Sequence, residues 1–150
     1  MILEGILMLI PFIVSICYKE SIVNMLAFLA PSLLVIGVGF ALQMLKAKRN
    51  NLYQKEGFAL VALTWIVMAL IGAIPFVING DIPNYINAFF ETASGLTTTG
   101  ASIITDITKI SHSSLFWRSF THWIGGMGVL VFIMAVLPLA GGGGDLHLMR

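Results

Sequence analysis

The chain has 150 residues, of which 58% are hydrophobic and 10% are charged, with a net charge of +1 and a mean hydropathy of +0.96. A soluble domain carries about 25% charged residues, so these charges are too few to cover its surface. The composition therefore excludes an ordinary soluble domain and a basic nucleic-acid-binding protein, and it predicts a helical protein that crosses a membrane several times.

Four apolar segments have, or nearly have, the length of about 17–25 residues that a transmembrane helix needs. They cover approximately residues 2–18, 22–45, 58–78 and 115–139. The predicted fold class is an all-α membrane protein with four transmembrane helices, one re-entrant pore helix and a filter loop. The predicted divisions are an N-terminal helix pair (1–45), a basic linker (46–55), a helix–pore loop–helix repeat (56–140) and a glycine-rich link (141–150).

Cationic residues predict the orientation, because short cytoplasmic loops are enriched in lysine and arginine. The linker contains four of them, which are Lys46, Lys48, Arg49 and Lys55. The segment between the last two apolar runs carries mainly acidic residues instead. We therefore expect the linker and the N-terminus on the cytoplasmic side, with the acidic segment outside.

A stretch too short to cross the membrane separates the third and fourth apolar runs. Asp81 and Asn84 are alternative N-caps for a short helix over residues 85–96. A polar loop follows immediately, which is typical of a re-entrant pore helix that leads into an ion filter. An amphipathic helix outside the membrane has the same length and is the alternative interpretation.

The loop over residues 94–102 is rich in threonine and glycine. Its oxygen atoms could replace the hydration shell of a potassium ion, and Gly100 can adopt a positive φ that aims a carbonyl group. The predicted ion-binding residues are Thr97, Thr98, Thr99, Gly100 and Ala101, with potassium at Thr98, Thr99 and Gly100. The alternative is that these small residues only allow close helix packing.

Glu91 and Arg118 are ionisable residues at the predicted membrane depth, where such groups are usually paired or functional. We expect them to pair behind the loop and support it. In the alternative, Arg118 extends to the membrane surface and Glu91 faces water. Trp117 and Trp123 are expected in an aromatic belt at the membrane surface, and the glycines at 125–128 offer a thin helix face for packing.

Catalytic patterns are not evident. His112, His122 and His147 lack the spacing of metal ligands, and no Ser/His/Asp arrangement occurs. We therefore expect no enzyme activity and no cofactor, with the potassium ion as a transported substrate.

Four motifs together resemble the Trk/Ktr family of potassium-uptake proteins, and in particular the N-terminal part of the membrane subunit in its Trk branch. They are Phe89-Phe90-Glu91, Leu96-Thr97-Thr98-Thr99-Gly100-Ala101, Phe116-Trp117-Arg118 and Trp123-Ile124-Gly125-Gly126-Met127-Gly128. The resemblance implies four helix–loop–helix repeats around one pore, two additional leading helices and a filter to which each repeat contributes one quarter. It also implies a homodimer, a cytoplasmic nucleotide-binding regulatory subunit, and a location in the inner (plasma) membrane.

The resemblance implies further repeats in a longer chain, because only one repeat is present here. Two other functions remain open at this point. One is a small channel built from four copies of this chain, and the other is a membrane assembly subunit that does not conduct ions.

Overall fold

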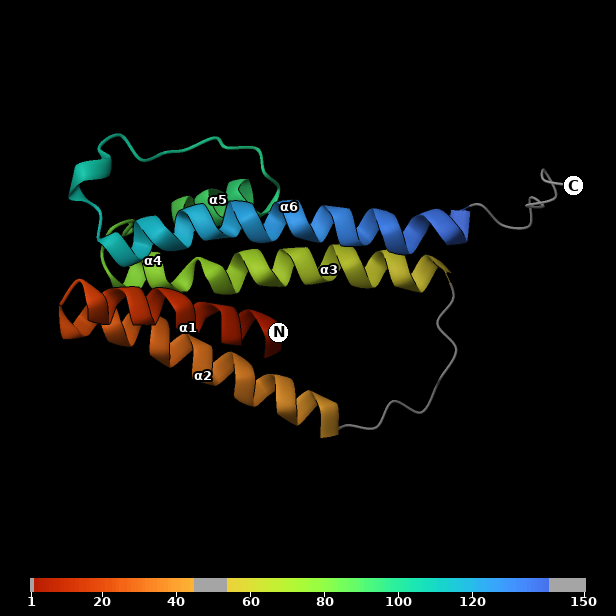
Figure 1. The fold of residues 1–150 in the computed structure, drawn as a ribbon, viewed down its shortest axis with the longest axis horizontal. Coiled ribbons are helices and arrows are strands. Elements are labelled where there is room, and N and C mark those ends of the chain that lie inside the picture. The colour runs from red at the N-terminus through yellow and green to blue at the C-terminus, as the bar shows by residue number, and fades with distance from the viewer. Residues whose placement is uncertain (1, 45–53, 141–150) are drawn as a thin grey trace, which may run out of the picture.

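The computed structural model describes residues 2–44 and 54–140, and within these two stretches it is helical and contains no strand (Figure 1). The elements in chain order are α1 (Ile2–Cys17), α2 (Ile22–Met44), α3 (Gln54–Gly72), α4 (Ile74–Ile78), α5 (Tyr85–Leu96), the 3-10 turn η1 (Ile107–Lys109) and α6 (His112–Ala140). The cationic cluster Lys46, Lys48 and Arg49 and the predicted link at 141–150 lie outside the described residues.

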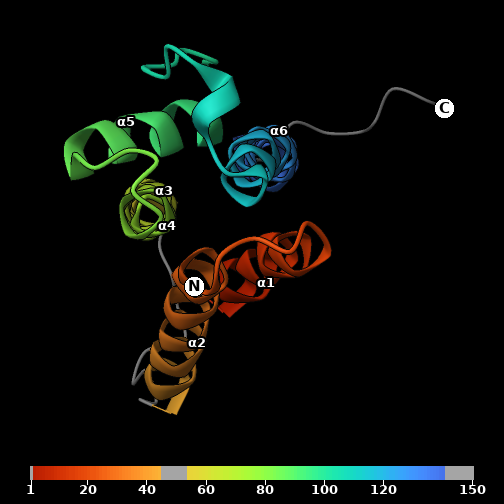
Figure 2. The same ribbon diagram turned by 90° about the vertical axis from the view of Figure 1, so that its left-hand side faces the viewer.

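The helices are arranged in three groups, which are the α1–α2 pair, the helices α3, α4 and α6, and the short helix α5. The first two, α1 and α2, form an antiparallel pair, and α3 and α6 lie side by side next to it (Figure 1). Figure 2 looks along α3 and α6, with α5 on one side of them and the α1–α2 pair on the other. Both α3 and α6 contact α5, and α6 also contacts α1. Helices α3, α4 and α6 therefore lie between the helix pair and the short helix α5.

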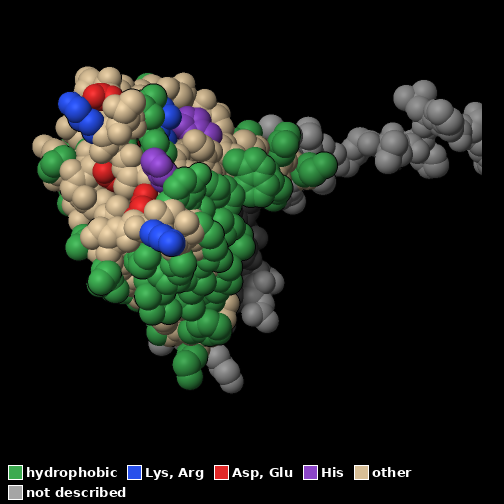
Figure 3. All heavy atoms as spheres, turned by 60° about the vertical axis from the view of Figure 1, so that its left-hand side comes forward, with side chains coloured by type: hydrophobic (Ala, Val, Ile, Leu, Met, Phe, Trp, Pro, Cys, Tyr) green, Lys and Arg blue, Asp and Glu red, His purple; other side chains and the backbone are tan. Residues whose placement is uncertain are grey.

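Apolar side chains also cover the outside of the helices. In α2, Phe28 is fully buried, whereas Leu33 and Leu34 on another face are 58% and 66% exposed. A helix that is apolar on all sides is typical of a membrane. Two stretches, Ile22–Met44 and Ala59–Ile78, are long and apolar enough to cross one, and α1 is apolar but shorter. On the face shown in Figure 3, ionisable side chains gather at one end beside a broad apolar surface, as expected for a membrane protein.

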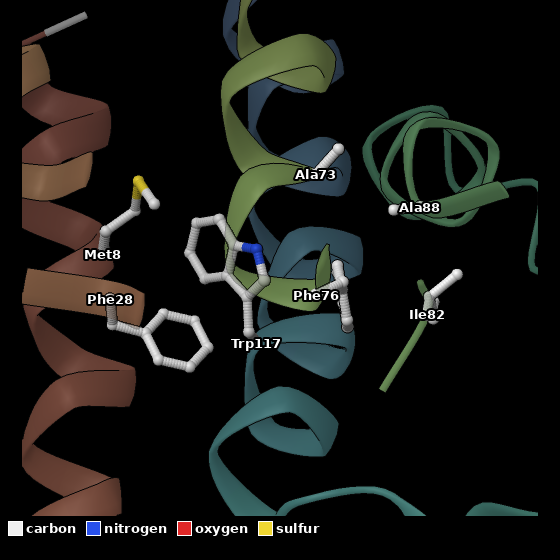
Figure 4. Close-up of a cluster of buried hydrophobic side chains, with 7 residues drawn as sticks. All are labelled: Met8, Phe28, Ala73, Phe76, Ile82, Ala88 and Trp117. Atoms are coloured by element: carbon white, nitrogen blue, oxygen red, sulfur yellow. The ribbon is translucent and has the colours of Figure 1, made fainter. Parts of the chain in front are cut away.

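A small core joins the three groups of helices. It contains Met8, Phe28, Ala73, Phe76, Ile82, Ala88 and Trp117 (Figure 4). Trp117 is only 2% exposed, and its indole Nε1 donates to the Gly72 carbonyl oxygen at 2.9 Å. The expectation that Trp117 belongs to an aromatic belt is therefore wrong, because its N–H has a buried acceptor and its ring packs in the core. Trp123 is 56% exposed.

The third apolar run is divided, although the sequence predicts one uninterrupted segment. Helix α3 ends at Gly72 and α4 begins at Ile74. Pro75 lies in the first turn of α4 and has no N–H to donate to the preceding turn. The same break leaves the Gly72 carbonyl oxygen available to Trp117.

The segment between α4 and α6 begins and ends at the same end of the molecule (Figure 1). The Asp81 carboxylate accepts hydrogen bonds from the Ser111 N–H at 3.2 Å and the Ser111 hydroxyl at 2.6 Å. The Asn79 amide donates to the Ser114 hydroxyl oxygen at 2.9 Å. These bonds hold the two ends of the segment together, so α5 and its loop form a hairpin-like excursion alongside α3 and α6.

Candidate functional site: the threonine–glycine loop

The structure identifies the N-cap of the short helix α5, for which the sequence offered two candidates, Asp81 and Asn84. The Asn84 side-chain oxygen accepts from the N–H of Ile86 at 2.9 Å and of Asn87 at 3.4 Å. Asp81 binds Ser111 instead. Asn84 is therefore the cap, because its side chain is the one that satisfies the free N–H groups of the first turn.

The loop after α5 has an alternating backbone. Thr98 has a φ of +57° and Gly100 a φ of +76°, with Thr99 between them outside the positive-φ region. The N–H of Thr98 donates to the Gly95 carbonyl oxygen at 2.9 Å, and the N–H of Thr99 donates to that of Ser94 at 2.9 Å. The N–H of Gly100 also points to the Ser94 oxygen, at 3.5 Å. Three successive N–H groups thus turn back toward the end of α5.

This pattern determines where the carbonyl groups point. In a trans peptide unit the C=O of one residue is directed opposite to the N–H of the next. The carbonyl oxygens of Thr97, Thr98 and Thr99 therefore project away from α5 on a common side. In an extended strand, successive carbonyls would alternate between two sides. All three threonines and Gly100 are exposed, so this row of oxygens lies on the surface of the chain.

The loop's own hydroxyl groups stabilise its shape. The Thr97 hydroxyl donates to the Ala93 carbonyl oxygen at 2.8 Å and lies 2.8 Å from the Thr99 hydroxyl. The Ser94 hydroxyl donates to the Ala101 carbonyl oxygen at 2.6 Å. The Ala101 carbonyl is thus turned toward the helix end, unlike the carbonyls of the three threonines.

A buried carboxylate lies behind the loop. Glu91 is 2% exposed, and its Oε1 lies 2.5 Å from Nε of Arg118 on α6. Its carboxylate also accepts from the Ser102 hydroxyl at 2.9 Å and from the Ile103 N–H at 3.0 Å. One side chain therefore ties α5, the returning loop and α6 together. The alternative in which Arg118 and Glu91 separate toward solvent does not occur.

Two glycines allow α5 to approach α6 very closely. A Cβ atom on Gly125 would overlap the Leu96 carbonyl oxygen, and one on Gly95 would overlap the Thr121 hydroxyl. Gly125 lies near the middle of the 29-residue helix α6. The threonine–glycine loop therefore begins halfway along α6, at the depth that the centre of a membrane would occupy if α6 crosses it.

The structure brings most of the predicted residues together in one place. Thr97, Thr98, Thr99 and Gly100 form a single exposed loop, and Glu91 and Arg118 form an ion pair beneath it. Ion binding by the loop, including Ala101, stays a prediction. Sequence reasoning missed the supporting roles of Ser94 and Ser102, although both serines flank the loop. The close packing expected of the glycines at 125–128 is confirmed at Gly125.

The described stretches contain no cluster of side chains typical of a transition-metal site. Within residues 2–44 and 54–140, no group of three or more His, Cys, Asp or Glu side chains could hold a metal ion. The loop offers backbone and hydroxyl oxygen atoms, and oxygen ligands suit hard cations better than soft transition metals.

Comparison with known proteins identifies the family. Residues 24–148 match TrkH, a family described as cation transport protein. The chain belongs to the TrkH family. This finding confirms the resemblance inferred from the motifs, and it does not favour the small homotetrameric channel or the non-conducting assembly subunit.

Several relatives in this family are transport proteins by name. An uncharacterized cation transporter of Methanocaldococcus jannaschii is 40% identical over 137 residues, which are 91% of this chain and 28% of that protein. The Trk system potassium uptake protein TrkH of Escherichia coli (strain K12) is 37% identical over 140 residues, which are again 91% of this chain and 28% of that protein. The Trk system potassium uptake protein TrkG of the same strain is 36% identical over 143 residues, which are 95% of this chain and 29% of that protein. The chain thus spans less than a third of these relatives. No solved structure matches it significantly.

Proposed function

We propose that this chain forms one wall of a potassium-selective pore and serves in potassium uptake across a membrane. Passage of the ion needs no covalent chemistry and no cofactor. The relatives named as Trk potassium uptake proteins support the choice of ion. The observation that carries the proposal is the row of carbonyl oxygens from Thr97, Thr98 and Thr99, since potassium filters replace the hydration shell with backbone carbonyls.

The electrostatics of the loop favour a cation. Helix α5 ends at Leu96, directly before the loop, so the negative end of its dipole lies beside the carbonyl row. The Glu91 charge is balanced by Arg118 and held by Ser102 and Ile103. In this proposal, Glu91 and Arg118 are positioning residues that keep the loop in shape. The ion is bound by the backbone oxygens of Thr98 and Thr99 in the carbonyl row and by that of Gly100, the next residue along the loop.

The carbonyl row of this chain cannot surround an ion by itself. The three oxygens project from one side of an exposed loop, so ligands on the other sides must come from elsewhere. We propose that further repeats of a longer chain supply them, each contributing a quarter of the filter. A homodimer and a cytoplasmic nucleotide-binding regulatory subunit are the proposed partners at the level of the whole protein.

The proposed membrane arrangement has four crossing helices and a re-entrant α5. The hairpin-like excursion between α4 and α6 supports a re-entrant segment, because both of its ends lie at one end of the bundle and its loop reaches the middle of α6. We propose that this end faces outward, with the N-terminus on the cytoplasmic side of the inner membrane.

The test compares two glycines in the complete protein. Gly100 and Gly80 have nearly the same φ, +76° and +77°, and an added Cβ meets no atom within 4 Å at either site. Gly100→Ser and Gly80→Ser therefore introduce a similar backbone strain of about 1–3 kcal/mol, but only the first alters the loop. Potassium and sodium fluxes into reconstituted vesicles, normalised to inserted protein, are the measurement.

We expect Gly100→Ser to reduce the preference for potassium over sodium, and Gly80→Ser to retain it. Potassium-limited growth should follow the same order. Unchanged selectivity in Gly100→Ser, or an equal loss in both variants, would refute the placement of the carbonyl row in the filter.

A further inference from the structure

Glu4 is a second buried carboxyl group, on the opposite side of the molecule from the loop. It lies in the first turn of α1 and is 3% exposed. Neither of its carboxylate oxygens has a hydrogen-bond partner among the described residues. Met8, one turn further along the same face of α1, packs in the core with Phe28 and Trp117 (Figure 4). Glu4 is therefore directed into the contact between α1 and its neighbours.

Charged groups on the neighbouring helices do not compensate Glu4. Helix α1 packs against α2 and α6. The described helix α2, Ile22–Met44, contains no ionisable side chain. Helix α6 contributes three groups, which are occupied elsewhere: Arg118 pairs with Glu91, His122 Nδ1 contacts the Arg118 carbonyl oxygen, and His112 packs edge-on against Tyr18.

An ionised carboxylate in this position would be unfavourable. Burial removes its water, and no hydrogen-bond donor among the described residues replaces that water. The helix dipole favours a negative charge in the first turn, but this effect is smaller than the desolvation of a buried ion. The neutral acid avoids the larger penalty.

We propose that Glu4 is a proton-binding site, and that its bound proton is required for α1 to pack against α2 and α6. The ligand is a single proton on the carboxyl group. Loss of the proton would place an uncompensated charge in the contact and loosen the helix pair from the repeat that carries the loop.

The direct test is infrared spectroscopy of the complete protein in lipid at neutral pH. The difference between wild type and Glu4→Gln should contain the C=O stretch of a protonated carboxylic acid, which shifts in D2O. Asp106→Asn is the control, because Asp106 bears an exposed carboxylate whose difference spectrum should contain only carboxylate bands. A Glu4→Gln spectrum with only carboxylate bands would overturn the proposal.

A second measurement tests the link to packing. In the unfolded chain a glutamate loses its proton above about pH 4.3, whereas the folded protein would retain it. The unfolding equilibrium constant of the wild type should therefore rise about tenfold per pH unit relative to Glu4→Gln, between about pH 5 and the pH at which Glu4 ionises. Glu4→Leu should behave like Glu4→Gln. If both variants are instead destabilised equally at every pH, Glu4 is an ionised partner of a cation and the proposal is wrong.

Discussion

The two sides of α6 are built on different physical principles. Toward α5, α6 presents Arg118 to a buried carboxylate and Gly125 to the backbone of Leu96. Toward the α1–α2 pair it presents Trp117, whose ring meets Phe28 edge-on with centroids 6.3 Å apart. The first contact depends on charge pairing and on the absence of a Cβ, and both requirements are strict. Around Trp117 the second depends on shape, which several apolar side chains can satisfy.

This difference has a functional meaning if the loop forms part of a filter. Carbonyl oxygens must be held at defined positions to bind one ion in preference to another. The side of α6 that contacts α5 therefore needs the strict interactions, whereas the α1–α2 side needs only to stay packed. The predictions below test this contrast, beginning with the largest expected effect.

Arg118→Ala should have the largest effect, because it leaves Glu91 buried without its cation. Breaking such a pair costs about 3–5 kcal/mol of unfolding free energy. The double variant Glu91→Ala/Arg118→Ala should recover part of this loss in a thermal or denaturant unfolding cycle. Lys109→Ala, which breaks the exposed pair with Asp106, is the control and should have no measurable effect. Strict additivity of Glu91→Ala and Arg118→Ala would show that the two residues do not interact.

Gly125→Ala should be the next most damaging change. Its Cβ would overlap the Leu96 carbonyl oxygen, so α5 must move away from α6. Overpacking of this kind costs about 1–3 kcal/mol, and displacement of the loop should also lower potassium selectivity. Gly126→Ala is a matched control, since its Cβ meets no atom within 4 Å. Equal stability and equal ion selectivity of the two variants would contradict the close approach.

Glu20 provides a pH-dependent test outside the apolar segments. Burial raises the pKa of Glu20, but hydrogen bonds from the Ser113 hydroxyl and N–H lower it, and the net pKa is below its usual 4.5. A lowered pKa stabilises the folded state above the unfolded value, and this contribution is lost as the pH falls through the folded pKa. Glu20→Gln should thus reduce stability by about 1–2 kcal/mol at neutral pH. As the pH falls from about 4.5 through the folded pKa, the two proteins should converge in thermal unfolding; a difference that persists below that pKa would argue against an ionised Glu20.

Met8→Leu should have the smallest effect. Met8 is fully buried against Phe28 and Trp117, and a change that conserves volume usually costs less than about 1.5 kcal/mol. Ion selectivity should be unchanged, because the loop lies on the other side of α6. A loss of selectivity as large as that of Gly125→Ala would remove the distinction between the two sides.

The sequence alone determined the class of the protein and the location of its candidate site. Composition and apolar runs depend only on local residue content, and the threonine–glycine loop after a short capped helix is a local pattern. The joint motifs were sufficient to predict the family that the comparisons confirm. A positive φ at Gly100 was also predictable, since glycine adopts this conformation at little cost.

The tertiary structure decided which of several equivalent residues takes each role. Asp81 and Asn84 were equal candidates for the cap until Asp81 proved to bind Ser111, 30 positions away. Trp117 does not lie in the expected aromatic belt, because its indole N–H donates to the carbonyl oxygen of Gly72, 45 positions away, at a helix break. Such partners come together only through packing of distant helices, and no local pattern specifies them. The same holds for the carbonyl row, whose direction is set by N–H groups that turn back to Ser94 and Gly95.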